Sequence, residues 1–469
     1  MKVIISDPIS NDGLKILEEN DIEIIDAIDD TINDDFQHID SAHAWIIRSG
    51  TKLDSKIINK ANNLTVIGRA GVGVDNIDIP AATRKGIVVM NTPDGNTISA
   101  AEHTIALMLA LSRNVSQGHR SLLRGRWDRN KFIGSELRNK TLGIVGLGKI
   151  GREVLQLSQA FNMKILGFDP FLPEDLFHSM EIELCDFDYI LKKSDYITLH
   201  VPLTRDTKNL FDYGALKKMK QEARIINVAR GGIINESDLA RILKENIISG
   251  AALDVFETEP LSNDSPLISA PNIILTPHLG ASTKEAKESV SISICTQIKN
   301  FLIKEDLENA INVPFKNIPQ LKEMAPFIKL SGVLGYIHSQ ISSGPVKEVK
   351  INCFGKTEEI KPIGFSFLKR FLESRVPERV NYINAGTIAK ELGINVTLNY
   401  STINSNYSNL ISATVIADKK VTLEGSVFDD NLPRLVSILG YKIEVNINGV
   451  LLFIQNDDVP GVIGKVGTL

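Results

Sequence analysis

The sequence predicts an α/β protein whose parallel sheets are covered by helices on both faces. Runs rich in Val and Ile alternate with polar, helix-like stretches over residues 1–98 and again from Thr141, which is typical of strands buried in open parallel sheets. A glycine-rich hexapeptide, "GLGKIG" at 146–151, follows one of these runs and precedes a helix-like stretch. A chain of 469 residues is also too long for one ordinary core, so we expect two to four domains.

The first series of runs predicts the first lobe. The runs are "KVIIS", "IEIID", "AWIIRS", "LTVIGRA" and "GIVVMN", each bounded by turn residues. The apolar segment 99–115 then has helical periodicity, and Ser99 with Glu102 three positions on forms a capping box. We interpret it as a buried helix that connects two lobes.

A second α/β series predicts a second lobe inserted in the first. Its runs are "TLGIVGL", "KILGFDP", "YITLHVP", "ARIINVA", "SGAALDVF" and "NIILTPH", and residues 284–300 are helix-like and return the chain to the first lobe. We therefore assign 1–98 and 285–312 to one doubly wound lobe and 99–284 to another.

The composition of the chain changes after Val313. "VPFKNIPQ" is a predicted linker, because Pro314 and Pro319 disfavour a continuous helix. Residues 316–446 are polar and contain strand-like pieces such as "GPVKEVKINCFG", "ISATVIAD" and "KVTLEGSVF", which predicts an α+β domain. Residues 449–469 offer a strand, a turn at Pro460-Gly461 and the start of a helix, too little to bury a core alone.

Composition excludes several classes of function. A net charge of -5 argues against nucleic acid as a partner. No apolar run approaches the roughly 20 residues that span a bilayer, and the first residues do not resemble a signal peptide. The cysteines, Cys185, Cys295 and Cys353, are scattered without ligand spacing, so we expect no metal site and a reduced, cytoplasmic protein without a membrane partner.

The glycines of "GLGKIG" fit the context that binds a dinucleotide. Gly146 permits a tight turn, Gly148 lets the backbone approach a pyrophosphate, and Gly151 lets helix and strand pack closely. An unliganded glycine turn is the alternative. Asp169 ends the next run, 18 residues past Gly151, where an acid accepts hydrogen bonds from a ribose and repels a 2′-phosphate. The pattern therefore favours NAD over NADP.

Three polar side chains follow apolar runs of the second series: Arg230 in "NVARGGIINE", Glu259 in "LDVFETEP" and His278 in "TPHLGAST". Strand C-termini line the ligand crevice of a doubly wound sheet, so these side chains are expected to converge. Each has a simpler explanation: a turn arginine, a solvated loop carboxylate, a loop histidine with satisfied hydrogen bonds. Hydride transfer needs an acid–base group and a group that holds the substrate, and the three together favour that function.

These motifs resemble those of the D-isomer-specific 2-hydroxyacid dehydrogenases. "RAGVGVDNID" (69–78) and "NTPDGNTISAAEHTIALMLALSRN" (91–114) are similar to the members that oxidise 3-phosphoglycerate, and the similarity covers nearly all of 1–310. The resemblance implies oxidation of 3-phospho-D-glycerate to 3-phosphohydroxypyruvate with NAD, the first step of L-serine biosynthesis. It also implies an intervening domain at 316–446, the start of a truncated ACT domain at 449–469, and a homodimer or homotetramer.

The resemblance also implies roles for individual residues. His278 is expected to be the general base, Glu259 to orient its imidazole, and Arg230 to hold the substrate carboxylate. Of the substrate positions, Arg129 is expected to reach a neighbouring subunit's site. The expected cofactor positions are Gly146, Gly148, Lys149, Ile150, Gly151, Asp169, Val201, Pro202, Val228, Ala229, Asp254, Gly280 and Ala281, and the substrate positions are Arg48, Ser49, Arg69, Asn96 and Arg129.

Two other functions stay open at this point. A glyoxylate or hydroxypyruvate reductase, or another D-2-hydroxyacid dehydrogenase, shares the chemistry but needs neither the C-terminal domains nor several arginines around one pocket. A nucleotide-sensing, non-catalytic relative with the same fold keeps the same core residues, so the three polar side chains do not exclude it.

Overall fold

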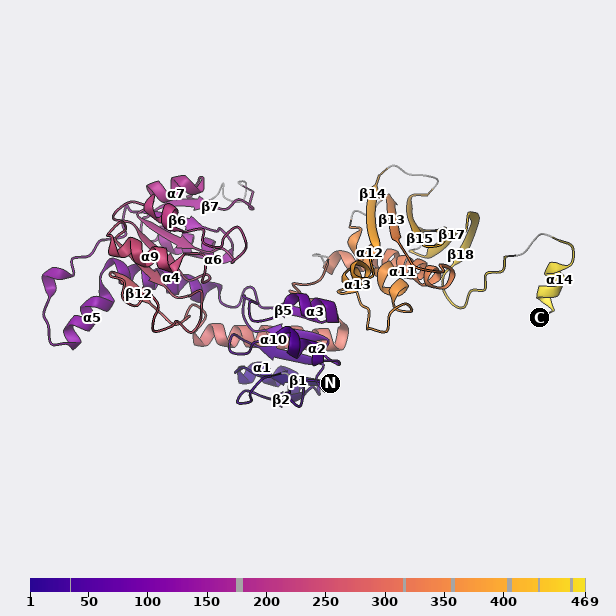
Figure 1. Ribbon diagram of the computed structural model, residues 1–469, viewed down its shortest axis with the longest axis horizontal. Helices are drawn as coiled ribbons and strands as arrows, with labels where there is room; N and C mark the ends of the chain where they lie inside the picture. The colour runs from indigo at the N-terminus through magenta and orange to yellow at the C-terminus, as the bar shows by residue number, and fades with distance from the viewer. Residues whose placement is uncertain are drawn as a thin grey trace.

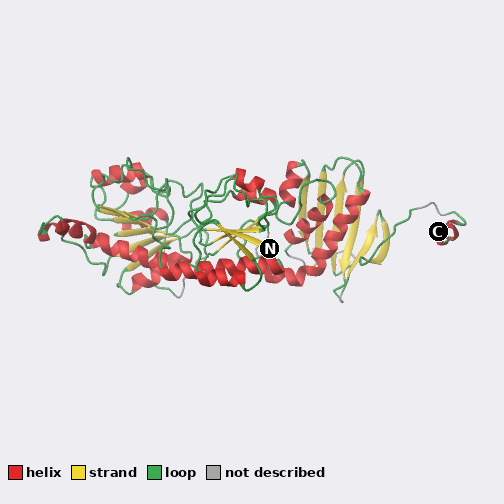
Figure 2. Cartoon of the chain, turned by 90° about the horizontal axis from the view of Figure 1, so that it is seen from below, coloured by secondary structure: helices red, strands yellow, loops and turns green. Residues whose placement is uncertain are grey.

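The computed structural model describes residues 1–33, 35–173, 180–314, 318–355, 359–402, 407–428, 431–455 and 459–468. Three sheets of five, seven and six strands form three separate bodies along an elongated molecule (Figure 1). The first lobe, which holds the N-terminus, lies between the second lobe and the C-terminal body (Figure 2). The fold class predicted from the sequence is confirmed for these three bodies, whereas the predicted domain boundaries stay predictions.

The first lobe contains a parallel sheet in the order β2-β1-β3-β4-β5. Each of the five predicted runs supplies one strand, and β3 is buried along its whole length. The elements are β1 (Lys2–Ile5), α1 (Asn11–Glu18), β2 (Glu23–Asp26), β3 (Ala44–Ile47), α2 (Ser55–Lys60), β4 (Val66–Arg69), α3 (Ile79–Lys85) and β5 (Val88–Asn91).

The second lobe contains a parallel sheet in the order β12-β11-β10-β9-β6-β7-β8. The six predicted runs supply six of its strands, and the short edge strand β8 was not predicted. The elements are β6 (Thr141–Val145), α6 (Lys149–Gln159), β7 (Lys164–Phe168), β8 (Glu183–Leu184), α7 (Phe187–Lys193), β9 (Tyr196–Leu199), α8 (Tyr213–Lys217), β10 (Arg224–Asn227), α9 (Glu236–Lys244), β11 (Gly250–Leu253) and β12 (Ile273–Leu275).

Two helices join the lobes. α4 (Thr97–Ser112) packs against α6 of the second lobe, and α10 (Lys284–Lys304) returns to pack against α1 and β4 of the first. Because α10 contributes to the core of the first lobe, the second lobe is inserted within it. The predicted capping box is wrong: α4 begins earlier, at Thr97 with Asn96 as its N-cap, and the hydroxyl of Ser99 instead donates to the Gly280 carbonyl over 2.8 Å.

An arm extends from α4 beyond the second lobe. It comprises α5 (Val115–Leu123) and a short 3-10 helix, η1 (Arg129–Lys131), and it projects from the end of the molecule (Figure 1). Large apolar side chains are exposed along it, with Trp127 83% and Ile133 84% exposed.

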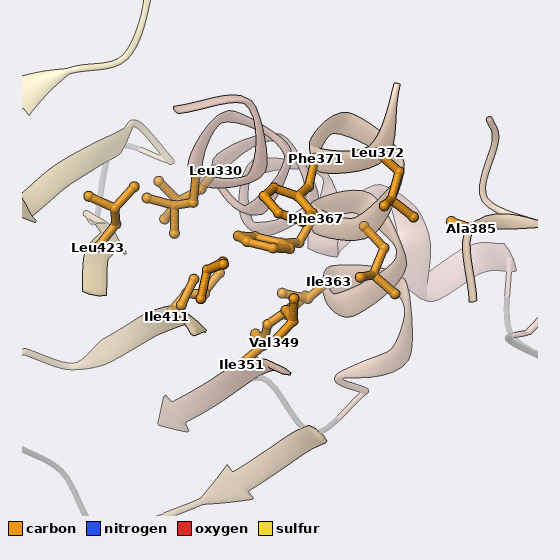
Figure 3. Close-up of a cluster of buried hydrophobic side chains, with 14 of the residues drawn as sticks. Leu330, Val349, Ile351, Ile363, Phe367, Phe371, Leu372, Ala385, Ile411 and Leu423 are labelled. Carbon is orange, nitrogen blue, oxygen red and sulfur yellow. The ribbon is translucent and has the colours of Figure 1, made fainter. Parts of the chain in front are cut away.

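The third body is an α+β domain, as predicted. Its mixed sheet has the order β14-β13-β15-β16-β17-β18, and helices cover one face, where Phe367 and Phe371 meet strand residues such as Ile411 (Figure 3). The elements are α11 (Ile318–Ile341), β13 (Glu348–Gly355), α12 (Lys361–Leu372), α13 (Ala385–Glu391), β14 (Asn395–Ser401), β15 (Asn409–Ile416), β16 (Lys420–Val427), β17 (Pro433–Ile438) and β18 (Tyr441–Asn446).

Two local predictions beyond the lobes are wrong. Pro319, expected in a linker, lies in the first turn of α11, where a missing N–H is tolerated. Residues 451–455 form no strand, because no neighbouring strand pairs with them in the described part of the chain, and Leu452 is 82% exposed. The predicted turn and helix do form, the latter as α14 (Val462–Gly467).

The described residues contain neither a membrane-spanning helix nor a cluster of metal-ligating side chains. Within the described ranges, no helix is both long and apolar enough to cross a bilayer. No cluster of three or more His, Cys, Asp or Glu side chains suited to a metal ion occurs among those same residues. The three cysteines are free thiols, and Cys295 and Cys353 are buried.

Candidate active site

The glycine-rich loop leads from the end of β6 directly into α6. Gly146 has a φ of 95°, and a Cβ there would lie 2.6 Å from the His200 carbonyl oxygen. A Cβ on Gly151 would lie 2.0 Å from the Gly146 carbonyl oxygen, so helix and strand approach this closely only with glycine. A Cβ on Gly148, the N-cap of α6, would meet no atom of the described residues within 4 Å. Open space before a helix N-terminus fits the pyrophosphate of a dinucleotide.

Asp169 follows β7 and lies against this loop. Its Oδ2 accepts from the Leu147 N–H over 2.9 Å, and its Oδ1 accepts from the Phe171 N–H over 3.0 Å. The carboxylate is therefore fixed beside the loop that would hold a dinucleotide. Lys149, in the first turn of α6, forms an ion pair with Asp94, which lies between β5 and α4.

Loops after the other strands meet at the same edge of the sheet. A Cβ on Gly231 would lie 1.8 Å from the Phe256 carbonyl oxygen, and one on Gly280 would lie 2.9 Å from Val228, so the loops after β10, β11 and β12 touch. The remaining predicted cofactor positions lie beside or on these loops and at the start of α6: Ile150, Val201, Pro202, Val228, Ala229, Gly280 and Ala281.

Asp254 organises the loop that carries His278. Its side chain is fully buried and accepts from the N–H groups of Leu279 and Gly280, each over 2.8 Å, and from Thr276 Oγ1 over 2.5 Å. His103 Nε2 on α4 lies 3.2 Å from Oδ1. Burial opposes ionisation of Asp254, but the hydrogen bonds from His103 and Thr276 outweigh it, so the pKa of Asp254 lies below its ordinary value.

His278 and Glu259 form a direct pair. His278 Nδ1 lies 2.7 Å from Glu259 Oε2, and Glu259 Oε1 accepts from the Phe256 N–H over 3.0 Å. Burial raises the pKa of Glu259, but the hydrogen bonds from His278 and the Phe256 N–H outweigh it and leave that pKa below its ordinary value. The carboxylate is thus ionised at neutral pH and fixes Nδ1 as the protonated nitrogen, which leaves Nε2 free to accept a proton.

Arginines from both lobes surround this edge. Arg69 ends β4 and is largely buried; burial, followed by the nearby Arg230 guanidinium, lowers the pKa of Arg69 to about 10. The Arg48 N–H donates to Asp7 Oδ2 over 2.7 Å, and the Thr51 N–H donates to the same oxygen over 3.0 Å. The charges that act on Arg69 are two further guanidinium groups, of Arg48 and Arg230, and two carboxylates, of Asp7 and Asp75, and this excess of positive charge suits an anionic ligand.

The predicted substrate positions divide into two groups. Arg48, Ser49 and Arg69 follow or end β3 and β4 on the edge that faces Arg230, and Asn96 is the N-cap of α4. Arg129 lies instead in η1 on the arm, outside the interlobe site of its own chain.

Sequence reasoning missed two residues of this site. Asp75 forms an ion pair with Arg230, with 3.0 Å between Oδ2 and Nε, and His103 contacts Asp254. Asp75 lies in the segment 69–78 and His103 in the segment 91–114, both of which are quoted above. Asp75 could have been predicted, because it is a charged residue in a glycine-rich loop that follows a strand. The contact of His103 with Asp254 could not, because only the fold brings these two residues together.

The second lobe and the third domain each match a family model. Residues 105–280 match the model described as "D-isomer specific 2-hydroxyacid dehydrogenase, NAD binding domain". Residues 323–439 match the one described as "D-3-phosphoglycerate dehydrogenase intervening domain". Neither match includes the ACT module predicted for the C-terminal segment.

Curated relatives extend the similarity over the whole chain. A D-3-phosphoglycerate dehydrogenase of Methanocaldococcus jannaschii is 43% identical over 99% of this chain and 89% of its own length. One of Bacillus subtilis is 40% identical over 100% of this chain and 89% of its own length.

Solved structures are similar over the two lobes. An NAD-dependent formate dehydrogenase from Staphylococcus aureus in complex with NAD has a TM-score of 0.60 and 30% identity, over 66% of this chain and 98% of its own. A D-lactate dehydrogenase from Aquifex aeolicus complexed with NAD and lactic acid has a TM-score of 0.58 and 28% identity, over 66% and 97%. From its full-length relatives, its NAD-binding lobe and its intervening domain, this chain belongs to the D-3-phosphoglycerate dehydrogenase family of NAD-dependent enzymes.

Proposed function

We propose that this enzyme oxidises 3-phospho-D-glycerate to 3-phosphohydroxypyruvate with NAD, the first step of L-serine biosynthesis. The observation that carries the proposal is the His278–Glu259 pair, 2.7 Å apart, on loops that touch the loop of Arg230 and share a sheet edge with the dinucleotide loop. A proton acceptor and a guanidinium beside a nicotinamide site are the groups that oxidation of a 2-hydroxyacid requires.

The residues present fit NAD. The backbone of 146–151, Lys149 and Ile150 would hold the pyrophosphate, Asp169 the adenosine ribose, and the loops at 201–202, 228–229 and 280–281 with Asp254 the nicotinamide half. When bound, NAD accepts the hydride from C2 of the substrate. The carboxylate of Asp169 leaves no favourable place for a 2′-phosphate, which favours NAD over NADP.

The chain's own residues would hold the substrate and take up its proton. Arg230 binds the carboxylate and polarises the C2 oxygen, because a planar guanidinium forms paired hydrogen bonds with oxygen anions. His278 Nε2 takes the hydroxyl proton, and Glu259, ionised and bound to Nδ1, stabilises the imidazolium that results. Arg48, Arg69, Ser49 and Asn96 would hold the phosphate end.

A substrate comparison tests the proposal. The purified chain is incubated with NAD and either 3-phosphoglycerate or D-glycerate while the keto product is trapped, and NADH absorbance is followed. We expect kcat/KM to be at least about a hundredfold higher for the phosphorylated acid, because buried arginines would otherwise be unpaired. Equal turnover of D-glycerate would favour a dehydrogenase of unphosphorylated acids. Nucleotide binding without turnover of either acid would favour a non-catalytic sensor.

We also propose that the arm mediates a homodimer or a homotetramer. The support is its exposed apolar surface, because contiguous apolar patches on a soluble protein mark contact sites. A second copy of this chain would cover it and would receive Arg129 near its own site. The exposed apolar residues are Val115, Leu122, Leu123, Trp127 and Ile133.

Light scattering tests this assembly. We expect the Trp127→Glu variant to have about half the wild-type molar mass at micromolar concentration, because a buried interfacial charge costs several kcal/mol. The matched control is Phe171→Glu, at another highly exposed aromatic residue away from the arm, and it is expected to keep the wild-type mass. A monomeric wild-type protein would contradict the proposal.

The free thiols of the three cysteines favour the cytoplasm as the compartment of this protein.

A further inference from the structure

An ion pair joins the two lobes at the active site. Asp75 lies in the loop between β4 and α3 of the first lobe, and Arg230 follows β10 of the second. The Nε of Arg230 donates to Asp75 Oδ2 over 3.0 Å. The Asp75 side chain is 71% exposed and that of Arg230 only 28%, so a solvent-facing carboxylate contacts a mostly buried guanidinium.

Two of the five N–H groups of the Arg230 guanidinium donate to protein oxygens. Nε is used by Asp75, and Nη1 donates to the Ala229 carbonyl oxygen over 2.6 Å. Among the described residues no acceptor binds the two N–H groups of Nη2 or the second one of Nη1, so these three are available to a substrate carboxylate. Asp75 thus occupies the side of the fork that a bidentate, end-on carboxylate does not need.

The backbone of the same loop contacts the other end of the guanidinium. A Cβ added at Gly73 would lie 2.0 Å from Arg230 Nη2 and 3.0 Å from Asp75 Oδ2. The loop is itself anchored, because Asn76 Nδ2 donates to the Arg48 carbonyl over 2.6 Å and to the Thr51 carbonyl over 2.5 Å. Segment 73–76 therefore holds the guanidinium between a carboxylate and a glycine backbone.

We propose that Asp75 is a positioning residue for this reaction, which fixes the Arg230 guanidinium so that its terminal nitrogens face the substrate carboxylate. The inference rests on the proposed function, since it assigns that carboxylate to Arg230. Asp75 acts through Arg230 and does not touch the substrate.

Loss of Asp75 has two opposing consequences. The guanidinium gains freedom to rotate, and misplacement of a clamping group lowers the rate of the chemical step. The site also gains net positive charge beside Arg48 and Arg69, which strengthens the attraction of an anionic substrate. A purely structural contact between lobes would instead raise KM and lower the unfolding temperature together.

Three variants separate these possibilities. Asp75→Ala removes both the contact and the charge. Gly73→Ala keeps the charge and displaces the guanidinium, because its Cβ would overlap Nη2. Asp78→Asn is the matched control: it removes a charge three residues away, and asparagine retains the N-cap hydrogen bond to the Ala81 N–H. For each, kcat and KM for 3-phosphoglycerate, NADH binding by fluorescence and the unfolding temperature are measured.

For Asp75→Ala we expect kcat to fall about 10- to 100-fold, with KM unchanged or lower. For Gly73→Ala we expect a similar fall in kcat with a raised KM, because the guanidinium moves but the Asp75 charge stays. Both variants are expected to bind NADH and to unfold like wild type, and Asp78→Asn to behave like wild type throughout. Wild-type kcat in Asp75→Ala, or a raised KM at unchanged kcat, would overturn the proposal. Failure of the proposed function would show differently, as absence of turnover by the wild-type enzyme.

Discussion

At the scale of single residues, the buried carboxylate of Asp254 holds the turn that carries the candidate base, His278. His278 has a φ of 54°, in the left-handed region, which costs energy for a residue other than glycine. Its N–H donates to the Asp254 carbonyl oxygen over 2.8 Å, and the next two N–H groups donate to the Asp254 side chain. A buried acid therefore stabilises the turn that presents the imidazole to Glu259.

The first prediction concerns His278. His278→Ala is expected to lower kcat by about 10³-fold, because a positioned general base contributes on the order of 10²- to 10⁴-fold. NADH affinity, measured by fluorescence titration, is expected to change little. The control is His38→Ala, a half-buried histidine between β2 and β3 of the first lobe. Equal losses in turnover and in cofactor binding would remove His278 from the acid–base role.

The second prediction concerns pH. The depressed pKa of Glu259 keeps it ionised at neutral pH, where its charge favours the imidazolium. The pair of this carboxylate with His278 is therefore present at neutral pH and is lost only as pH falls through the depressed pKa of Glu259. Glu259→Gln removes the charge at every pH, so kcat/KM at pH 7 is expected to fall about 10- to 100-fold, while NADH binding measured by fluorescence changes little. Wild-type kcat/KM of Glu259→Gln at pH 7 would show that Glu259 does not act on His278.

At the scale of elements, two glycines of the glycine-rich loop have different roles: one lets the helix pack on the strand, and the other leaves space for a ligand. Gly151 has a backbone oxygen within overlap distance of its missing Cβ, whereas Gly148 faces open space. The same motif therefore contains one glycine required by the fold and one available to a ligand.

The third prediction uses this pair. Gly151→Ala is expected to lower the free energy of unfolding by about 1–3 kcal/mol, because the added methyl group overlaps backbone. Gly148→Ala is expected to unfold like wild type and to bind NAD at least about tenfold more weakly, because the methyl group occupies the space of the pyrophosphate. Thermal unfolding and NAD titration of both variants test these two roles. A destabilised Gly148→Ala with normal NAD binding would reverse the assignment.

Prediction from sequence succeeded where strands are buried on both faces. Runs such as 44–47 are continuously apolar and end in two Ile residues, which is typical of a covered parallel strand. Strands of the third domain differ: β18 is largely exposed, and β14 carries polar residues on an edge. β14 pairs with β13 far earlier in the chain, and β18 forms a hairpin with β17 but lacks a continuous apolar run, so neither was predicted. The same limit applies to the site, where Asp75 meets Arg230 only because the two lobes fold against each other.

At the scale of the whole molecule, the third domain contacts the first lobe at the end of α3. Asn381 Nδ2 donates to the Gly86 carbonyl over 2.6 Å, and Asn384 Nδ2 donates to the Arg84 carbonyl over 3.2 Å. Arg84 Nε also pairs with Glu391 Oε1 at 2.7 Å. The loop that precedes α3 carries Asp75, so one short helix connects the third domain to the active site.

The fourth prediction concerns this contact. Asn381→Ala removes the hydrogen bond to Gly86 together with those that its Oδ1 accepts from the Ile383 and Asn384 N–H groups, and loss of the first is expected to weaken docking of the third domain by about 1 kcal/mol. Hydrogen exchange is then expected to be faster in the last turn of α3 and in α13, with the cores of both bodies unchanged. Asn399→Ala, which removes an amide contact to Asn352 within the third domain, is the control. Unchanged exchange in α3 would show that Asn381 does not secure the contact.

The central claim is that hydride leaves C2 of the substrate for NAD while His278 takes the hydroxyl proton. The most direct test uses 3-phosphoglycerate labelled with deuterium at C2, followed by mass spectrometry of the reduced cofactor. We predict one deuterium in NADH, a primary isotope effect on the chemical step, and loss of both signals in His278→Ala. Turnover that leaves the deuterium out of NADH would contradict the account.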